Sequence, residues 1–113
     1  MYLKLLIGRM QDALTALSSP RRREIVRLVW ARERSAGDIA AAFDVSWPAI
    51  SQNLRVLRES GLITERRVGT SRLYRADRDA LRPLEAYLLG MWTRKVDRLR
   101  LLAEAEERNR SKS

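Results

Sequence analysis

The sequence predicts a small, mainly helical domain that is interrupted by one short β-hairpin. Two observations lead to this fold class. Apolar residues recur every three to four positions through most of the chain, which is the period of amphipathic helices. In residues 62–76 the pattern changes to two short runs around a Gly-containing turn, which is typical of a hairpin. A chain of 113 residues has room for one such domain, which we assign to residues 1–103.

Two helices are predicted at the beginning of the chain. Residues 2–17 form the first, because their apolar side chains share one face. Ser19 then fits the N-cap of a second helix, and Pro20 fits its first position, where no amide hydrogen is needed. The apolar residues Ile25 and Leu28 lie on one face of this second helix.

A helix-turn-helix is predicted at residues 35–60. Helices at 36–43 and 47–59 are separated by the tight turn Asp44-Val45-Ser46, in which Ser46 is the N-cap of the later helix. Apolar positions on both helices meet if the helices cross at a steep angle around a small core. These core positions are Ile39, Phe43, Val45, Ile50, Leu54 and Leu57.

Residues 62–76 are predicted to form a wing after this helix pair. Short strands at 62–68 and 72–76 flank the turn Gly69-Thr70-Ser71. Two helices joined by a tight turn and followed by a hairpin make a winged helix-turn-helix, which is our expected fold.

The charge balance favours a polyanionic partner. The chain has 23 basic and 14 acidic residues, which gives a formal net charge of +9, and 20 of the basic residues are arginine. Residues 20–78 alone hold 13 arginines against 7 acidic residues. A GC-rich genome explains part of the preference for arginine over lysine, but it does not explain the excess of positive charge. We therefore expect this domain to bind nucleic acid.

Two sets of residues are predicted to contact DNA. The outer face of the 47–59 helix offers hydroxyl, amide, guanidinium and small apolar groups, which suit base edges in a major groove. The hairpin offers arginines around a tip of small residues, which suits phosphates or a minor groove. The first set is Ser46, Trp47, Pro48, Ala49, Ser51, Gln52 and Arg55, and the second is Arg66, Arg67, Thr70, Ser71 and Arg72. The alternatives are an ordinary polar helix face and a merely solvated hairpin.

Several segments of the chain resemble the ArsR family of bacterial repressors. Residues 16–29, ALSSPRRREIVRLV, resemble the family's entry segment. Residues 45–63, VSWPAISQNLRVLRESGLI, look like its recognition helix, and residues 65–75, ERRVGTSRLYR, are similar to its wing. The match covers roughly residues 12–100. It implies a dimeric repressor that occludes promoters, with autoregulation and control of a neighbouring gene. It also implies that Arg21, Arg22 and Arg23 brace the fold, and phosphate contact is the alternative.

The chain departs from the metal sensors of that family. Those proteins commonly carry cysteines on the helix that corresponds to residues 36–43, or histidine and carboxylate ligands on the last helix. This chain has no cysteine and no histidine, so we expect no metal site of that kind and no cofactor. A carboxylate-only site at Asp97 or Glu104 is the alternative, and surface pairing also explains both residues. Trp47 and Asn53 stand where the family often has Gln and His, so the operator sequence is expected to differ.

A dimer interface is predicted on the first and last helices. A long helix over residues 78–103 carries an apolar stripe that one small core cannot cover, and so does the helix at 2–17. The interface residues expected from these two stripes are Leu3, Leu6, Ile7, Met10, Leu84, Leu88, Met91, Trp92, Val96 and Leu99. Residues 104–113 have almost nothing to bury and are expected to form a frayed or disordered tail.

Other functional classes are disfavoured by the sequence. No apolar run approaches the roughly 18 residues of a membrane span, so we expect no membrane association and a cytoplasmic location. The chain lacks a His or Cys base–nucleophile arrangement and a phosphate-cradling glycine motif, so we do not expect an enzyme. The alternative function is a winged-helix module that binds a protein or RNA partner. The sequence indicates no particular small-molecule effector.

Overall fold

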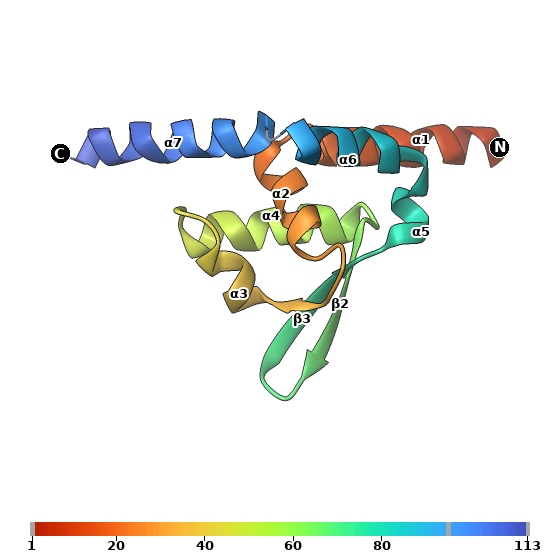
Figure 1. Ribbon diagram of the computed structural model, residues 1–113. Coiled ribbons are helices and arrows are strands. Elements are labelled where there is room, and N and C mark those ends of the chain that lie inside the picture. Colours follow the sequence, from red (N-terminus) through yellow and green to blue (C-terminus); the bar gives the residue numbers. More distant parts are fainter. Residues whose placement is uncertain (1, 95, 113) are drawn as a thin grey trace.

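The helix-turn-helix and its wing lie on one side of the molecule, and the terminal helices lie along the other (Figure 1). The computed structural model describes the backbone of residues 2–94 and 96–112, and the side chains of residues 2–94 and 100–108. The elements in chain order are α1 (Tyr2–Ala16), α2 (Pro20–Leu28), β1 (Arg34–Ser35), α3 (Ala36–Ala41), α4 (Trp47–Glu59), β2 (Ile63–Val68), β3 (Ser71–Ala76), α5 (Arg78–Leu81), the 3-10 helix η1 (Arg82–Leu84), α6 (Glu85–Arg94) and α7 (Val96–Lys112). The predicted mainly helical fold with a small sheet is confirmed.

Serine side chains cap three of the helices. The Oγ atoms of Ser19, Ser35 and Ser46 accept hydrogen bonds from the backbone amides three residues later, at 3.3, 3.1 and 3.4 Å. Each bond satisfies an amide that has no partner within its own helix. Pro20 and Pro48 occupy the first turns of α2 and α4, where a missing amide hydrogen is tolerated. The start of α4 is therefore well defined, together with the polar residues around it.

The two helices of the helix-turn-helix share one core, as predicted. Ile39 of α3 and Ile50 and Leu57 of α4 are fully buried. Phe43 and Val45, in the connection between the helices, are partly buried against them. The same core continues into α1, α2 and the hairpin through Ala16, Leu17, Ile25, Val26, Leu62, Ile63 and Tyr74. One continuous core therefore fixes α4 relative to the wing.

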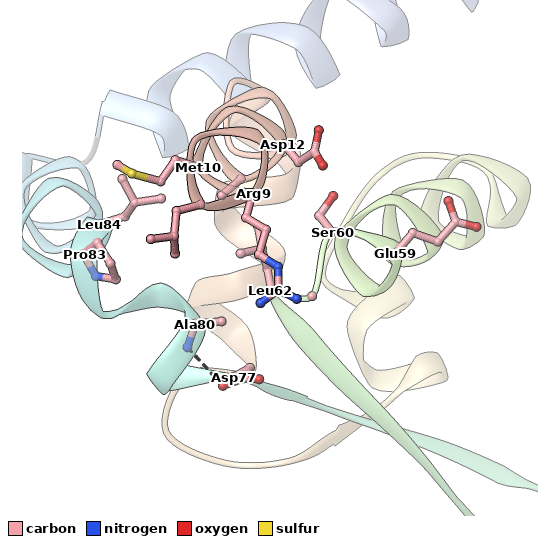
Figure 2. Close-up of a pocket in the computed structure, with 13 residues that line it drawn as sticks. Arg9, Met10, Asp12, Glu59, Ser60, Leu62, Asp77, Ala80, Pro83 and Leu84 are labelled. Atoms are coloured by element: carbon pink, nitrogen blue, oxygen red, sulfur yellow. Dashed lines mark hydrogen bonds between the residues drawn. The ribbon is translucent and has the colours of Figure 1, made fainter. Parts of the chain in front are cut away.

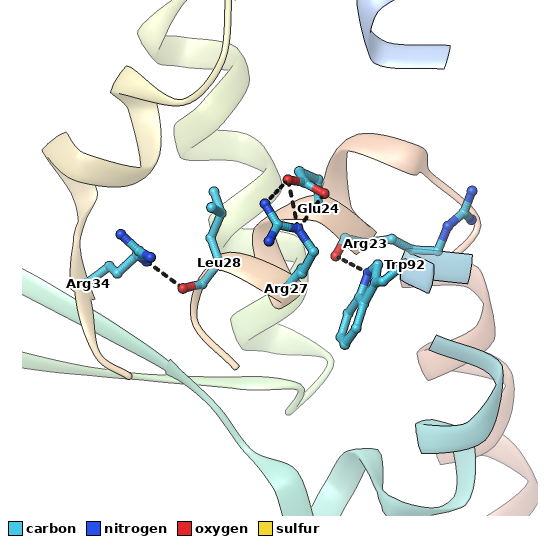
Figure 3. Close-up of polar contacts among 6 residues, drawn as sticks. All are labelled: Arg23, Glu24, Arg27, Leu28, Arg34 and Trp92. Carbon is cyan, nitrogen blue, oxygen red and sulfur yellow. Dashed lines mark hydrogen bonds and ion pairs between the residues drawn. The ribbon is translucent and has the colours of Figure 1, made fainter. Parts of the chain in front are cut away.

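A two-residue strand, β1, adds a third strand that the sequence analysis missed. The strand order is β1-β3-β2, all antiparallel, and Arg34 of β1 lies opposite Tyr74 of β3. The Arg34 Nε atom donates a hydrogen bond to the Leu28 carbonyl at the end of α2, at 2.5 Å (Figure 3). Because β1 has only two residues, it is too short to show a periodic pattern in the sequence.

The tip of the hairpin turns at Gly69, which has a φ of 62°. Glycine adopts this conformation readily because it has no side chain.

The C-terminal part of the chain differs from the single helix predicted at 78–103. Pro83 interrupts that helix, because proline has no amide hydrogen and its ring clashes with the preceding turn. The chain therefore passes through α5 and η1 before α6 begins at Glu85. The apolar stripe continues past Pro83, so apolar spacing alone does not reveal the break.

The structure also differs from the frayed tail predicted for residues 104–113. Helix α7 continues to Lys112 and packs against α2. Glu104 forms an ion pair with Arg21 at 3.5 Å. Ala105 is partly buried, and it shares a hollow with Phe43 of the helix-turn-helix connection. These contacts stabilise α7 against the rest of the protomer, and they could not be predicted from the composition of residues 104–113.

Two arginines at the start of α2 connect α1 to the helix-turn-helix. The Arg22 Nε atom donates to the Ala16 carbonyl at 2.5 Å, and its Nη1 atom donates to Asn53 Oδ1 in α4 at 3.3 Å. Arg23 is only 3% exposed, and its Nη1 atom donates to the Leu17 carbonyl at 2.6 Å. The guanidinium groups satisfy carbonyls at the end of α1 that have no helical partner. Both residues act as braces, as the resemblance implied.

An aromatic contact ties α6 to the end of α2. The rings of Trp30 and Trp92 meet edge to face, with centroids 5.3 Å apart. The Trp92 Nε1 atom donates to the Arg23 carbonyl at 3.2 Å (Figure 3). The Arg78 guanidinium lies 4.6 Å from the centroid of the Trp30 ring, a cation–π distance. Trp92 is therefore engaged within the protomer, whereas the sequence analysis assigns it to a dimer interface.

We expect Arg22→Ala to destabilise the fold, because it leaves the Ala16 carbonyl and the Asn53 side chain without this donor. Losing a hydrogen bond from a charged group costs about 1–3 kcal/mol. Urea unfolding followed by circular dichroism measures the difference. Arg32→Ala is the matched control, because Arg32 is exposed, and it should unfold within about 0.5 kcal/mol of the wild type. Equal losses in the two variants would contradict the bracing role of Arg22.

Candidate nucleic-acid interface

The exposed side of α4 carries most of the residues predicted to read DNA. Because α4 buries Ile50, Leu54 and Leu57, the residues about half a turn away face outward. The exposed residues of the predicted set are Ser46, Trp47, Pro48, Ser51, Gln52 and Arg55. Five of them line one open hollow of about 520 Å³, namely Trp47, Pro48, Ser51, Gln52 and Arg55. The first helical turns therefore present an apolar ring, a hydroxyl, an amide and a guanidinium together.

Two other residues of α4 are turned away from this face. Ala49 is partly buried, and its carbonyl accepts a hydrogen bond from Asn53 Nδ2 at 2.8 Å. Asn53 is 8% exposed and also accepts the hydrogen bond from Arg22. Ala49 therefore lies at the margin of the exposed face. Asn53, one of the two positions where the chain departs from the family pattern, has a bracing role within the protomer.

A cleft of about 430 Å³ separates α4 from the wing. Trp47 and Ser51 line the cleft from α4, and Arg72 lines it from β3. Thr70 and Ser71 are exposed at the tip of the hairpin, which projects away from the helices (Figure 1). The helix face and the wing are therefore neighbouring surfaces, and Trp47 belongs to the boundary between them.

The three wing arginines lie on two different faces of the hairpin. Residues directly opposite each other in antiparallel strands share a face, and Arg67 lies opposite Arg72. By the alternation of side chains, this face also holds the buried Tyr74, so it is the face that packs toward the core. Arg66 is on the other face, where its Nε and Nη2 atoms donate to the Glu33 carboxylate at 2.6 and 2.7 Å. Only two of the three predicted arginines therefore share the face nearest α4.

A hydrogen-bonded ion pair connects α4 to the wing. The Arg58 Nη1 atom, near the end of α4, donates to Glu65 Oε2 in β2 at 2.6 Å. The Arg72 Nε atom is 3.8 Å from the other carboxylate oxygen, beyond hydrogen-bond distance. The hydrogen bond from Arg58 lowers the pKa of the Glu65 carboxyl. Burial raises the pKa of the neighbouring Tyr74 hydroxyl, and the charge of Glu65 raises it further.

Glu33, Arg58 and Glu65 form ion pairs at the wing that were not predicted from the sequence. Glu33 and Arg66 are far apart in the sequence, and no local pattern connects them. The position of Glu65 could have been found from the sequence. It lies two residues after the buried Ile63, so both side chains are on the inner face of β2. A carboxylate at such a position needs a basic partner, which here is Arg58.

Helix α1 presents an apolar surface to solvent. All four of its predicted dimer residues are exposed, and Leu3 is the most exposed of them at 69%. These residues are Leu3, Leu6, Ile7 and Met10. Leu14, at the end of the same predicted stripe, is also exposed, and two further exposed apolar residues of α1, Tyr2 and Leu5, were not predicted. This surface is too apolar and too continuous to be explained as scattered exposed residues.

The residues of the last helices that were predicted to form a dimer interface differ in how far they are buried. Leu88 is fully buried within the protomer, so it has no surface to offer to a partner. Leu84 and Met91 are partly buried, like Trp92. The side chains of Val96 and Leu99 lie outside the described residues.

A hollow of about 660 Å³ lies between α1, the turn from α4 to β2, and the α5–η1 segment (Figure 2). Leu6 and Met10 of α1 belong both to its lining and to the exposed apolar surface. Figure 2 shows the Arg9 side chain reaching from α1 toward Leu62. The hollow is therefore continuous with the surface predicted to pair with a second copy.

Among the described side chains, those of residues 2–94 and 100–108, no group of three or more metal-ligating residues is placed to hold an ion. In the same part of the chain, every helix is too short or too polar to cross a membrane.

A short helix, a tight turn and a second helix whose polar face adjoins a basic hairpin define a winged helix-turn-helix DNA-binding protein. The comparisons with known proteins agree. Residues 19–65 match the family described as bacterial regulatory protein, arsR family. The HTH-type transcriptional regulator Rv2034 of Mycobacterium tuberculosis is 35% identical over 94 residues, which are 83% of this chain and 88% of that protein.

Two further relatives extend the comparison. The transcriptional repressor SdpR of Bacillus subtilis is 38% identical over 60 residues, covering 53% of this chain and 67% of the relative. A solved homodimeric winged helix-turn-helix DNA-binding domain from Mycobacterium bovis, a possible ArsR-family regulator, has a TM-score of 0.68 and 29% identity. The similarity covers 81% of this chain and 84% of that one.

The chain belongs to the ArsR family of bacterial regulatory proteins and is a DNA-binding transcriptional regulator. The resemblance stated from the sequence is confirmed. The family and these relatives are regulators of transcription and not enzymes, in agreement with the prediction.

We expect the contact between α4 and the wing to weaken in acid. Because the folded-state pKa of Glu65 is lowered, its stabilising effect is fully present above the ordinary glutamate pKa and is lost as the pH falls through the folded-state value. Urea unfolding of the wild type and Glu65→Gln between pH 7 and pH 3 measures this effect. The wild type should be the more stable protein at pH 7, and the difference should shrink toward pH 3. A difference that stays constant over this range would contradict the role of the Glu65 charge.

Proposed function

We propose that the protein is a homodimeric repressor that binds double-stranded operator DNA in the cytoplasm. The observation that carries the proposal is the adjoining position of two surfaces. Ser51, Gln52 and Arg55 are exposed on α4, and Arg67 and Arg72 lie on the neighbouring face of the wing. The first surface suits base edges, and the second suits the phosphate backbone.

The residues of α4 have distinct roles in this proposal. Gln52 can pair through its amide with an adenine in the major groove, and Arg55 can bind guanine or a phosphate. Ser51 offers a hydroxyl to either kind of partner. Trp47 and Pro48 offer apolar surface that suits a thymine methyl group. Ser46, Ala49, Thr70 and Ser71 lie at the margins of this surface, where backbone approach to phosphates matters more than base recognition.

A twofold dimer supplies two copies of α4. The exposed apolar surface of α1 supports dimer formation, because an uncovered surface of this kind marks a protein interface. The solved relative from Mycobacterium bovis is homodimeric. In a twofold dimer the two recognition helices would enter successive major grooves about 34 Å apart. A dimer bound across a promoter would exclude RNA polymerase, and the relative from Bacillus subtilis is a transcriptional repressor.

The alternative is a winged-helix module that binds a protein or RNA through the same basic surface. Sequence-selective, salt-dependent binding to short duplex DNA distinguishes the two, because a protein- or RNA-binding module would not select among duplex sequences. The exposed amide of Gln52 favours the DNA-reading function, because a purely electrostatic surface has no need of it.

We expect sedimentation at micromolar concentration to give about twice the chain mass of 13.1 kDa. The double variant Leu3→Glu, Ile7→Glu should sediment as a monomer, because it places charges in the apolar surface of α1. Val68→Glu is the matched control, since Val68 is also an exposed apolar residue but lies on the wing, and it should remain a dimer. A monomeric wild type would contradict the proposal that two copies of α4 enter successive major grooves.

We expect Gln52→Ala to weaken binding to an operator selected from genomic fragments and to relax the preference at one or two base pairs. Loss of a good bidentate base contact costs about 1–3 kcal/mol of discrimination. Arg72→Ala should instead weaken operator and scrambled duplexes alike and make the salt dependence shallower by about 0.9 per lost phosphate contact. Fluorescence anisotropy across a salt series measures both effects. If Gln52→Ala kept full selectivity and Arg72→Ala abolished it, the wing would be the reader.

A further inference from the structure

An ion pair with two hydrogen bonds joins Glu33 to Arg66 in the middle of the hairpin. Two guanidinium nitrogens of Arg66 donate to the two oxygens of the Glu33 carboxylate, at 2.6 and 2.7 Å. This paired geometry is the strongest form of an arginine–carboxylate contact. It connects β2 to the loop between α2 and β1. Glu33 is a residue to which the DNA-reading function assigns no role.

The pair lies on the hairpin face that is turned away from α4. Arg67 and Arg72 are opposite each other on the inner face, and Arg66 alternates to the outer face. The Arg67 side chain has no hydrogen bond or ion pair among the residues that the structure describes. The Arg72 side chain is half exposed, and its Nε atom lies 3.8 Å from the Glu65 oxygen that Arg58 does not bind. Its other neighbour is the Tyr74 hydroxyl.

We propose that Arg67 and Arg72 form the phosphate-binding surface of the wing, and that Glu33 keeps Arg66 out of it and thereby limits DNA affinity. The inference rests on the proposed DNA-binding function and adds to it a residue that opposes binding. The pair uses the Nε–H and one Nη2–H of Arg66, so a phosphate could reach only the remaining N–H groups of the guanidinium. The Glu33 carboxylate would lie close to a phosphate bound there and would repel it.

The charge state of Glu33 is consistent with this role. The hydrogen bonds from Arg66 lower the pKa of the Glu33 carboxyl, so the group is charged at neutral pH. The intact pair is therefore electrically neutral. Removing only Glu33 leaves a free cation on the wing, and removing only Arg66 leaves a free anion beside the DNA. Removing both members leaves the local charge unchanged.

The test compares Glu33→Gln, Arg66→Ala and the double variant that carries both changes. Fluorescence anisotropy is measured on a selected operator and on a scrambled duplex across a salt series. Glu33→Gln should tighten binding to both duplexes by about fivefold per half-site near 0.15 M salt and steepen the salt slope by about 0.9. Arg66→Ala should weaken binding to both. The double variant should bind like the wild type, with an unchanged slope.

Asp79→Asn is the matched control. Asp79 of α5 forms an exposed pair with Arg82 of η1 at 2.6 Å, beyond the end of the hairpin that is away from its tip. This control removes the same charge from an exposed arginine–carboxylate pair and should change the affinity less than twofold. Arg67→Ala is a further variant and should weaken binding to both duplexes. Urea unfolding of each variant shows whether the fold is retained.

Two results would overturn the inference while leaving the repressor function in place. One is a double variant that binds more weakly than the wild type with a shallower salt slope, because Arg66 would then itself bind a phosphate. The other is a Glu33→Gln variant that gains no more affinity than Asp79→Asn. A wild-type protein without selective duplex binding would instead overturn the proposed function.

Discussion

The burial of one face of α4 fixes both the core of the domain and the orientation of its exposed polar surface. Ile50, Leu54 and Leu57 occupy the interior, and each contributes about 1.5–3 kcal/mol by leaving water. Because a helix has a fixed period, this choice of interior face also decides which residues point outward. Gln52 and Arg55 face solvent for that reason. The stability of the core and the orientation of the DNA-reading surface are therefore consequences of the same packing.

Hydrogen bonds from side chains connect α4 to α1 on one side and to the wing on the other. At one end, Arg22 connects the last turn of α1 to Asn53 of α4, so the apolar surface of α1 has a defined position relative to α4. At the other end, Arg58 and Glu65 hold the wing to the last turns of α4. A rigid relation between α1 and α4 matters for a dimer, because the spacing of successive major grooves is fixed by the DNA.

Several arginines of this basic chain are paired with acidic residues of the same protomer. Glu24, Glu33 and Glu65 form hydrogen-bonded pairs with Arg27, Arg66 and Arg58, as Figure 3 shows for the first pair. The bonds between Arg27 and Glu24 measure 2.9 and 3.0 Å. Other arginines, among them Arg22 and Arg23, are occupied by backbone carbonyls. The net charge of +9 therefore indicates a polyanionic partner, but it does not identify the arginines that meet it.

The helix starts, the helix-turn-helix core and the hairpin could be predicted from the sequence, because serine caps, proline positions and apolar spacing are local properties. The exposed face of α4 could be predicted as well, since the period of a helix relates that face to the buried one. The pairing of the arginines depends on the folded chain, because Glu33 and Arg66 are 33 positions apart in the sequence. Tertiary contacts likewise placed Leu88 and Trp92 inside the protomer and gave α7 its partners on α2. The physical reason is that a local pattern shows that a side chain is apolar or charged, whereas its partner is chosen by segments that the folded chain brings together.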